Sequence, residues 1–181
     1  MGATLSSVKA YSEILQGNAN NPSIANLIKE NSIEMIERLD VIAWATNPLH
    51  DHFKSVKSHM MKFAVPLCHA HQIECSIESE NISDDMIMSG DVRQNIFLVF
   101  KEAVNNLVKY SAASTCTISL FIRSGQFHLQ VNDNGRGLDG GIKGSGNGLK
   151  NMQKRAEELN GKLIIETNAF QGTSVTLAIP Y

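Results

Sequence analysis

Val131-Asn132-Asp133-Asn134-Gly135-Arg136-Gly137 is the most informative segment of this 181-residue sequence, because it joins a strand pattern to a run of glycines. From Phe127 to Val131, apolar and polar residues alternate, which is typical of a strand with one buried face. The carboxylate of Asp133, held at the end of that strand, can accept a hydrogen bond from an exocyclic amine. The glycines that follow let the backbone approach a flat ligand closely. We therefore predict a ligand site here.

The glycine-rich segment continues to Gly148, and seven of the 13 glycines lie in residues 135–148. A helix is expected from about Leu149, and its free N–H groups and dipole would favour phosphate. Two common phosphate loops are excluded: no helix opens at Gly135-x-Gly137-x-x-Gly140, as a Rossmann site requires, and no Walker A sequence is present. A flexible surface loop remains the alternative interpretation.

The helix expected at 91–110 has two faces. Its apolar residues recur at i, i+3, i+4 and i+7 and predict a core face. The opposite stripe is Glu102, Asn105, Asn106 and Lys109, at the same spacing. Two adjacent asparagines are poor helix formers, so a ligand could offset their cost. Glu and Asn oxygens suit Mg²⁺, and a lysine suits phosphate. A plain solvated face is the alternative.

The remaining elements follow from hydrophobic periodicity and from glycine and proline breaks. We expect helices at 3–17, 22–44, 52–71 and 149–159. Strands are expected around Ile73-Cys75-Ile77 and at 116–123, 126–133, 162–167 and 173–179. Strands interrupted by helices, mostly in hairpin order, predict an α+β sandwich with helices on one face of the sheet.

The N-terminal helices form a separate unit that Asn47-Pro48 ends, so the expected domains are 1–48 and 49–181. In the second helix, Ile28, Met35, Leu39 and Ile42 form a seam that resembles a coiled coil. Other aliphatic residues widen this apolar surface. The unit is therefore interpreted as half of a dimeric four-helix bundle, or as a hairpin packed on its own domain.

Composition excludes several classes of protein. The chain is 43% hydrophobic and 19% charged, as in an ordinary globular protein, and its net charge of −2 indicates no nucleic-acid surface. The apolar run Ile96–Phe100 is far too short to span a membrane. Three cysteines without a C-x-x-C pair indicate reduced thiols in a cytosolic chain.

One further cluster, in residues 68–75, could suggest a metal. It contains Cys68, His69, His71 and Cys75, but the spacing matches no standard zinc pattern. Buried cysteines and surface histidines are the preferred interpretation.

Four motifs in order resemble one known family. Lys101–Ser111 resembles its N box, Asp133-x-Gly135-x-Gly137 its G1 box, Gly144-x-Gly146-x-Gly148-Leu149 its G2 box, and Gly172-Thr173 its terminal element. The family is that of the Bergerat (GHKL) ATP-binding fold, and more closely the catalytic region of bacterial sensor histidine kinases. The resemblance implies a Bergerat α/β sandwich, a mixed sheet with helices on one face, preceded by a truncated helical hairpin.

The first residues extend the resemblance. Met1–Ser6 looks like the sequence just after the phosphoacceptor in the subfamily whose motif reads His-Asp-x-x-Gly, which implies an acceptor histidine outside the chain. The N-terminal unit would then be a truncated dimerisation and phosphotransfer module. Leu49-His50-Asp51 superficially matches the acceptor motif. It follows Pro48 and lacks the rest of the motif, so we interpret it as a decoy.

The resemblance also implies a role for individual residues, with ATP and Mg²⁺ as cofactors. Asp133 would bind the adenine amine with support from Thr173, Asn106 would ligate Mg²⁺, Lys109 would contact phosphate, and Glu102 would be the catalytic base for the attacking imidazole. The implied ATP site comprises Asn105, Asn106, Lys109, Tyr110, Asp133, Gly135, Gly137, Lys143, Gly146, Gly148, Leu149 and Thr173. Gly137, Gly146 and Gly148 would shape a mobile lid, and Lys143 or Lys150 could reach the phosphates.

The implied function is transfer of the ATP γ-phosphoryl group to a histidine, for relay to a response regulator receiver domain. The implied parent is a homodimer through its N-terminal helices, with these residues in the cytoplasm and an inner-membrane receptor left open. Without the upstream histidine, autophosphorylation is not expected. The alternative is a degenerate GHKL module that acts as an ATP-gated interaction domain without phosphotransfer.

Overall fold

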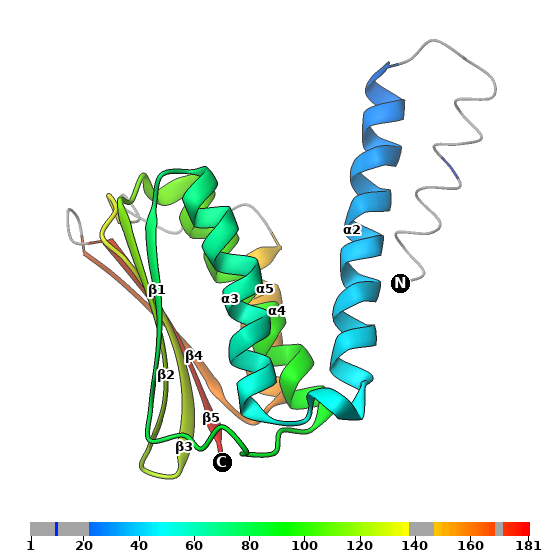
Figure 1. The fold of residues 1–181 in the computed structure, drawn as a ribbon. Helices are drawn as coiled ribbons and strands as arrows, with labels where there is room; N and C mark the ends of the chain where they lie inside the picture. Colours follow the sequence, from blue (N-terminus) through cyan, green and yellow to red (C-terminus); the bar gives the residue numbers. More distant parts are fainter. Residues whose placement is uncertain (1–9, 11–21, 138–146, 169–171) are drawn as a thin grey trace. The chain divides into compact units, whose positions relative to one another are not determined.

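Five strands form one mixed sheet in the order β1-β2-β3-β5-β4 (Figure 1). Their bounds are β1 Glu74–Glu80, β2 Thr115–Arg123, β3 Gln126–Asp133, β4 Lys162–Asn168 and β5 Gly172–Pro180. β1 pairs parallel to β2, and every other pair is antiparallel. The strand positions predicted from alternation are confirmed to within a residue or two at their ends, and the mixed α+β sheet is confirmed with them.

This computed structural model describes residue 10 and residues 22–137, 147–168 and 172–181. The chain divides into two compact units, Met1–Thr46 and Asn47–Tyr181. In the first unit, helix α2 runs from Pro22 to Thr46 with a proline in its first position, as its sequence predicts. The helix expected at 3–17 lies outside the described residues. None of the described helices combines the length and apolar character that crossing a membrane requires.

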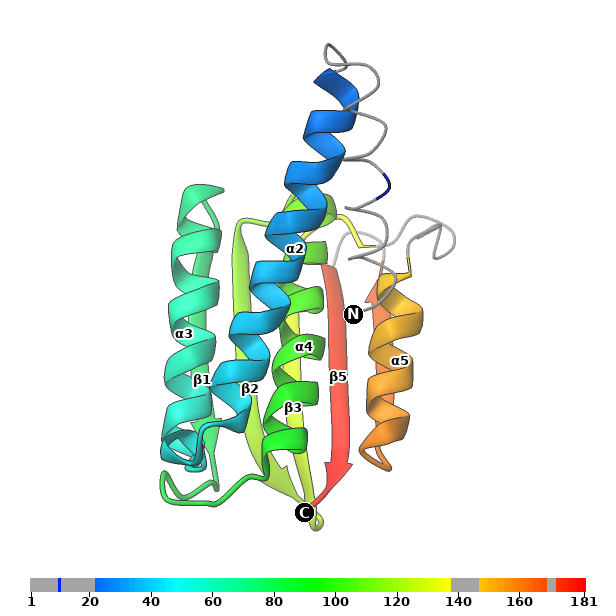
Figure 2. The same ribbon diagram turned by 90° about the vertical axis from the view of Figure 1, so that its right-hand side faces the viewer.

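In the second unit, three helices lie side by side over one face of the sheet (Figure 2). They are α3 Phe53–Ala70, α4 Gly90–Asn106 and α5 Gly148–Glu158, with a short 3₁₀ turn η1 at Pro48–His50. The core lies between these helices and the sheet, where Phe53 meets Phe127 edge to face with ring centroids 6.3 Å apart. Helices on one face only are what the sequence predicts.

The helix expected to run to residue 110 is α-helical only as far as Asn106. Residues Leu107–Ser111 form a π-helical turn, η2, and Ala112 ends it in the left-handed region at φ 53°. The loop after β3 holds this wider turn in place, because Arg136 N donates to the carbonyl of Ser111 (2.9 Å) and its Nε donates to that of Tyr110 (3.0 Å). Periodicity could not reveal a turn that a distant loop stabilises.

Asp51, part of the segment interpreted as a decoy, forms an ion pair with Arg93 of α4. Arg93 is buried and also donates to the carbonyl of Met88 (2.6 Å). Asn47 caps the intervening turn through its side chain, which accepts from Leu49 N (3.0 Å). Asp51 therefore has a structural partner, since a buried guanidinium needs a carboxylate.

Candidate functional site

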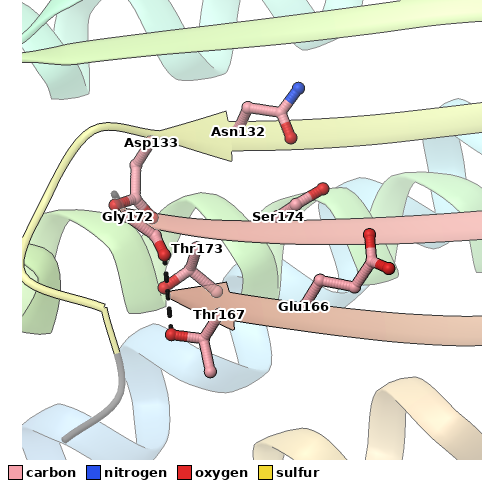
Figure 3. A pocket seen from close by; sticks show the side chains of 7 residues that line it. All are labelled: Asn132, Asp133, Glu166, Thr167, Gly172, Thr173 and Ser174. Carbon is pink, nitrogen blue, oxygen red and sulfur yellow. Dashed lines mark hydrogen bonds between the residues drawn. The ribbon is translucent and has the colours of Figure 1, made fainter. Parts of the chain in front are cut away.

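An open pocket of about 380 Å³ lies at one end of the sheet, where β3 and β4 end and β5 begins (Figure 3). Four of its residues come from the ends of strands β3 and β4, and the other three open strand β5. They are Asn132, Asp133, Glu166, Thr167, Gly172, Thr173 and Ser174. Two residues of the sequence-derived site, Asp133 and Thr173, therefore share one pocket.

Asp133 is the last residue of β3 and continues the strand's inward-facing series after Val131. Its Oδ1 accepts a hydrogen bond from Gly135 N at 2.8 Å, so the carboxylate also orders the turn that follows. Burial raises the pKa of Asp133, while backbone hydrogen bonds from Gly135 and Thr173 act to lower it. The result is a half-buried hydrogen-bond acceptor of defined orientation, suited to an amine of a flat ligand.

Two glycines around Asp133 are required by close backbone packing. Gly172 has φ +86°, and a Cβ there would lie 1.7 Å from the backbone oxygen of Asp133. A Cβ on Gly135 would lie 2.3 Å from the carbonyl oxygen of Ser111. The sequence interpretation gave the glycines after Asp133 a role in ligand approach. For Gly135, the close neighbour in the structure is the π-helical turn of the same chain.

The polar stripe of α4 forms the second part of the site. Glu102, Asn105 and Asn106 are all partly buried, and Asn106 Nδ2 donates to Glu102 Oε1 at 3.2 Å. Gly148, the first residue of α5, lies so close that a Cβ on it would fall 1.9 Å from Glu102 Oε1. No side chain caps the start of α5, so its first N–H groups remain available beside the stripe.

The other residues of the sequence-derived site are less constrained by contacts. Lys109 and Tyr110 lie in the π-helical turn and are exposed, so Lys109 does not continue the α-helical stripe. Gly137 is buried with φ +71°, and Leu149 is half-buried in the first turn of α5. Lys143 and Gly146 lie outside the described residues. Lys150 is exposed.

Sequence reasoning missed Thr167 and Glu166 at the end of β4. Thr167 Oγ1 donates to the carbonyl of Gly172 at 3.5 Å across the pocket rim (Figure 3). The strand pattern of 162–167 predicted β4, but its pairing with β5 brings these residues to Asp133, and pairing is not visible in the sequence.

The histidines of the 68–75 cluster do not join its cysteines in a metal-like group among the described residues. His69 and His71 are exposed. Cys68 and Cys75 are joined instead by Cys116, which sequence reasoning did not connect with them, and all three are free thiols. Hydrogen bonds from Cys116 and Cys75 lower the pKa of Cys68 to about 4, against burial, which raises it.

Comparison with known proteins agrees with this geometry. The profile of the family described as "Histidine kinase-, DNA gyrase B-, and HSP90-like ATPase" matches residues 91–181. Sensor histidine kinase MctS of Rhizobium johnstonii is 33% identical over 112 residues, which is 60% of this chain and 24% of that protein. Sensor histidine kinase LiaS of Bacillus subtilis is 34% identical over 101 residues, 55% and 28% respectively. The chain thus covers about a quarter of the length of each.

Solved structures share the fold. Histidine kinase AdeS of Acinetobacter baumannii has a TM-score of 0.64 at 18% identity, over 98% of this chain and 94% of that one. Full-length ShkA in complex with AMPPNP has a TM-score of 0.63 at 13% identity, over 87% and 38%. At these identities the likeness concerns the fold alone.

Proposed function

Because this chain belongs to the family of histidine kinase-, DNA gyrase B- and HSP90-like ATPases, we propose that it is the ATP-binding catalytic region of a sensor histidine kinase. In this proposal it transfers the ATP γ-phosphoryl group to a histidine, for relay to a response regulator receiver domain. The observation that carries the proposal is the position of Asp133, a half-buried carboxylate on the wall of an open pocket.

Asp133 would hold the adenine. Its Oδ1 already accepts from Gly135 N, and a carboxylate has capacity for a further donor such as the exocyclic amine. Thr173 lies in the same pocket and would support the base. Gly172 removes the side chain that would otherwise displace the backbone of Asp133. These contacts give the pocket the polarity and the flat approach that a purine needs.

Asn106 would ligate Mg²⁺. Its Nδ2 donates to Glu102, which directs the amide oxygen away from that carboxylate, and an amide oxygen is a hard donor that suits Mg²⁺. Bound Mg²⁺ would neutralise charge on the phosphates. The uncapped start of α5 at Gly148 and Leu149 would offer N–H groups to the same phosphates, and Lys109 would supply a positive charge. Lys143 and the lid glycine Gly146 remain part of the proposed site.

Glu102 would be the catalytic base. It would accept the proton from one nitrogen of the acceptor imidazole while the other nitrogen attacks the γ-phosphorus and ADP leaves. The hydrogen bond from Asn106 fixes the orientation of the carboxylate, and the missing side chain at Gly148 leaves it room. Since Glu102 would act on the imidazole, nucleotide binding would not depend on it.

The proposed protein functions in the cytoplasm as a homodimer through the unit at 1–48, with the catalytic domain at 49–181. Several large aliphatic side chains of α2 support this arrangement because they are exposed, with Ile36 at 59% and Leu39 at 49%. An apolar helix face of this kind is typical of a helical bundle between subunits. The receiver domain and the dimer are parts of the proposal.

Calorimetric titration of Mg-ATP tests the proposal in four proteins: wild type, Asp133→Ala, Glu102→Ala and, as a matched carboxylate control, Asp85→Ala. We expect binding to be lost in Asp133→Ala alone, since Asp85 is an exposed surface residue that lies outside the pocket. If Asp133→Ala bound Mg-ATP like the wild type, the adenine site would be wrongly assigned. Absence of binding in the wild type would favour a degenerate interaction module over a kinase.

A further inference from the structure

Three thiols that the proposed nucleotide chemistry does not use converge at one corner of the fold. Cys68 lies in the last turn of α3, Cys75 in β1 and Cys116 in β2. Their sulfur atoms all lie within 4.8 Å of one another. Cys68 and Cys116 are buried, and Cys75 is partly exposed. Only cysteines make up this group among the described residues.

The backbone holds the three residues in place from regular elements. Cys75 and Cys116 are direct partners in the parallel β1–β2 pair, so their side chains emerge on the same face of the sheet. The carbonyl of Cys68 accepts from His71 N (3.0 Å) and from Ile73 N (2.9 Å), which ties the end of α3 to the start of β1. A site built on helices and strands is more precisely arranged than one built on loops.

Three convergent sulfurs are a recognised donor set for soft metal ions. With metal–sulfur bonds of about 2.3 Å, three thiolates around one ion stand about 4 Å apart, a spacing these cysteines reach with small side-chain rotations. We propose that Cys68, Cys75 and Cys116 together bind one thiophilic d¹⁰ metal ion, Cu(I) or Zn²⁺. Three sulfurs complete the coordination of Cu(I). Zn²⁺ prefers four ligands and would take a water on the exposed side, at Cys75.

The site would lie one strand from the nucleotide pocket. Cys116 is the direct antiparallel partner of Asp133, so both side chains lie on the helix-covered face of the sheet. The two sites nevertheless share no side chain, since none of the three cysteines lines the pocket. The metal site is therefore independent of the proposed kinase function, and each can fail without the other.

The test is titration of the reduced 181-residue protein under anaerobic conditions. One arm supplies Cu(I) as its coloured bicinchoninate complex, and the other supplies Zn²⁺ in competition with a chromogenic chelator. We expect one ion per chain, and an affinity at least about tenfold lower in Cys75→Ser, whose partly exposed position makes it the variant best suited to fold. His69→Ala and His71→Ala are matched controls that should bind as the wild type does, because neither histidine belongs to the group.

A second measurement needs only the wild type. Thiol alkylation followed by mass spectrometry should find the three cysteines protected when the ion is bound, and binding should raise the unfolding temperature. Whichever arm gives cysteine-dependent uptake identifies the ion. The proposal is overturned if neither ion binds, if Cys75→Ser binds as tightly as the wild type, or if the thiols form a disulfide without retaining metal.

Discussion

Glu102 and Gly148 occupy adjoining space, and a Cβ on Gly148 would lie 1.9 Å from Glu102 Oε1. The contact joins the middle of α4 to the first residue of α5, two elements separated by both hairpin strands β2 and β3. Glycine at 148 thus leaves the carboxylate of Glu102 in place. In the proposed mechanism this carboxylate is the base, so the position of α5 and the chemistry are coupled through one missing side chain.

Gly148→Ala should impair phosphoryl transfer more than it impairs folding. The clashing atom is the tip of a flexible side chain, so Glu102 can rotate away, and alanine favours a helix by up to about 1 kcal/mol over glycine. Displacing a general base should slow transfer by about 10²-fold or more. The measurement is transfer from labelled ATP to a separately supplied histidine-bearing domain, with Mg-ATP affinity and urea unfolding in parallel. Lys154→Ala, on an exposed part of α5, is the control. Unchanged transfer in Gly148→Ala would contradict the role of Glu102.

Gly172→Ala should destabilise the fold and remove the nucleotide pocket. Gly172 has φ +86°, and its Cβ would meet the backbone oxygen of Asp133 at 1.7 Å, a contact that only movement of the main chain can relieve. Left-handed strain alone costs an alanine about 1–2 kcal/mol, and the clash adds to it. Gly125→Ala isolates the strain, because Gly125 has φ +71° with nothing within 4 Å of its Cβ. Urea unfolding should give a larger loss for Gly172→Ala, and equal losses would argue against the clash.

The stability of the protein should carry an acid-range signature of Asp133. Burial raises its pKa above the ordinary value of 3.8, so the native chain holds this proton more tightly than the unfolded chain does. Its contribution to stability is therefore complete below pH 3.8 and declines as pH rises through the raised native pKa. Asp133→Asn should remove that decline. Urea unfolding over a pH series measures it, with Ser174→Ala as a pocket-lining control. Parallel profiles for wild type and Asp133→Asn would show that the native pKa of Asp133 is not raised.

Asp51→Ala should destabilise the second unit, because it leaves the buried guanidinium of Arg93 without its carboxylate. Breaking a buried ion pair costs about 3–5 kcal/mol, and the 40% exposure of the Asp51 side chain reduces this to about 2 kcal/mol. Asp85→Ala is the matched control, since the Lys54–Asp85 pair spans 3.7 Å between well-exposed side chains and should contribute less than about 0.5 kcal/mol. Equal free energies of unfolding for the two variants would remove the structural role of Asp51.

Local patterns predicted most of the fold. The strict alternation in 116–123 and 126–133 predicts β2 and β3, because a strand with one buried face repeats every two residues. The spacing of the α4 stripe likewise placed Glu102 and Asn106 together, and a hydrogen bond joins them. Asp133 followed from the same alternation at the end of β3. The residues of the unit at 1–48 other than 10 and 22–48 lie outside this comparison.

Contacts between distant segments could be found only in the tertiary structure. The π-helical turn at Leu107–Ser111 depends on Arg136, 25 residues beyond it, and no helical period encodes that hydrogen bond. Thr167 reaches the pocket of Asp133 through the β4–β5 pairing, and Cys116 reaches Cys68 and Cys75 through the parallel β1–β2 pairing. Periodicity reports which face of an element is buried. The partner that covers this face follows from strand order and register, which the whole chain decides when it packs.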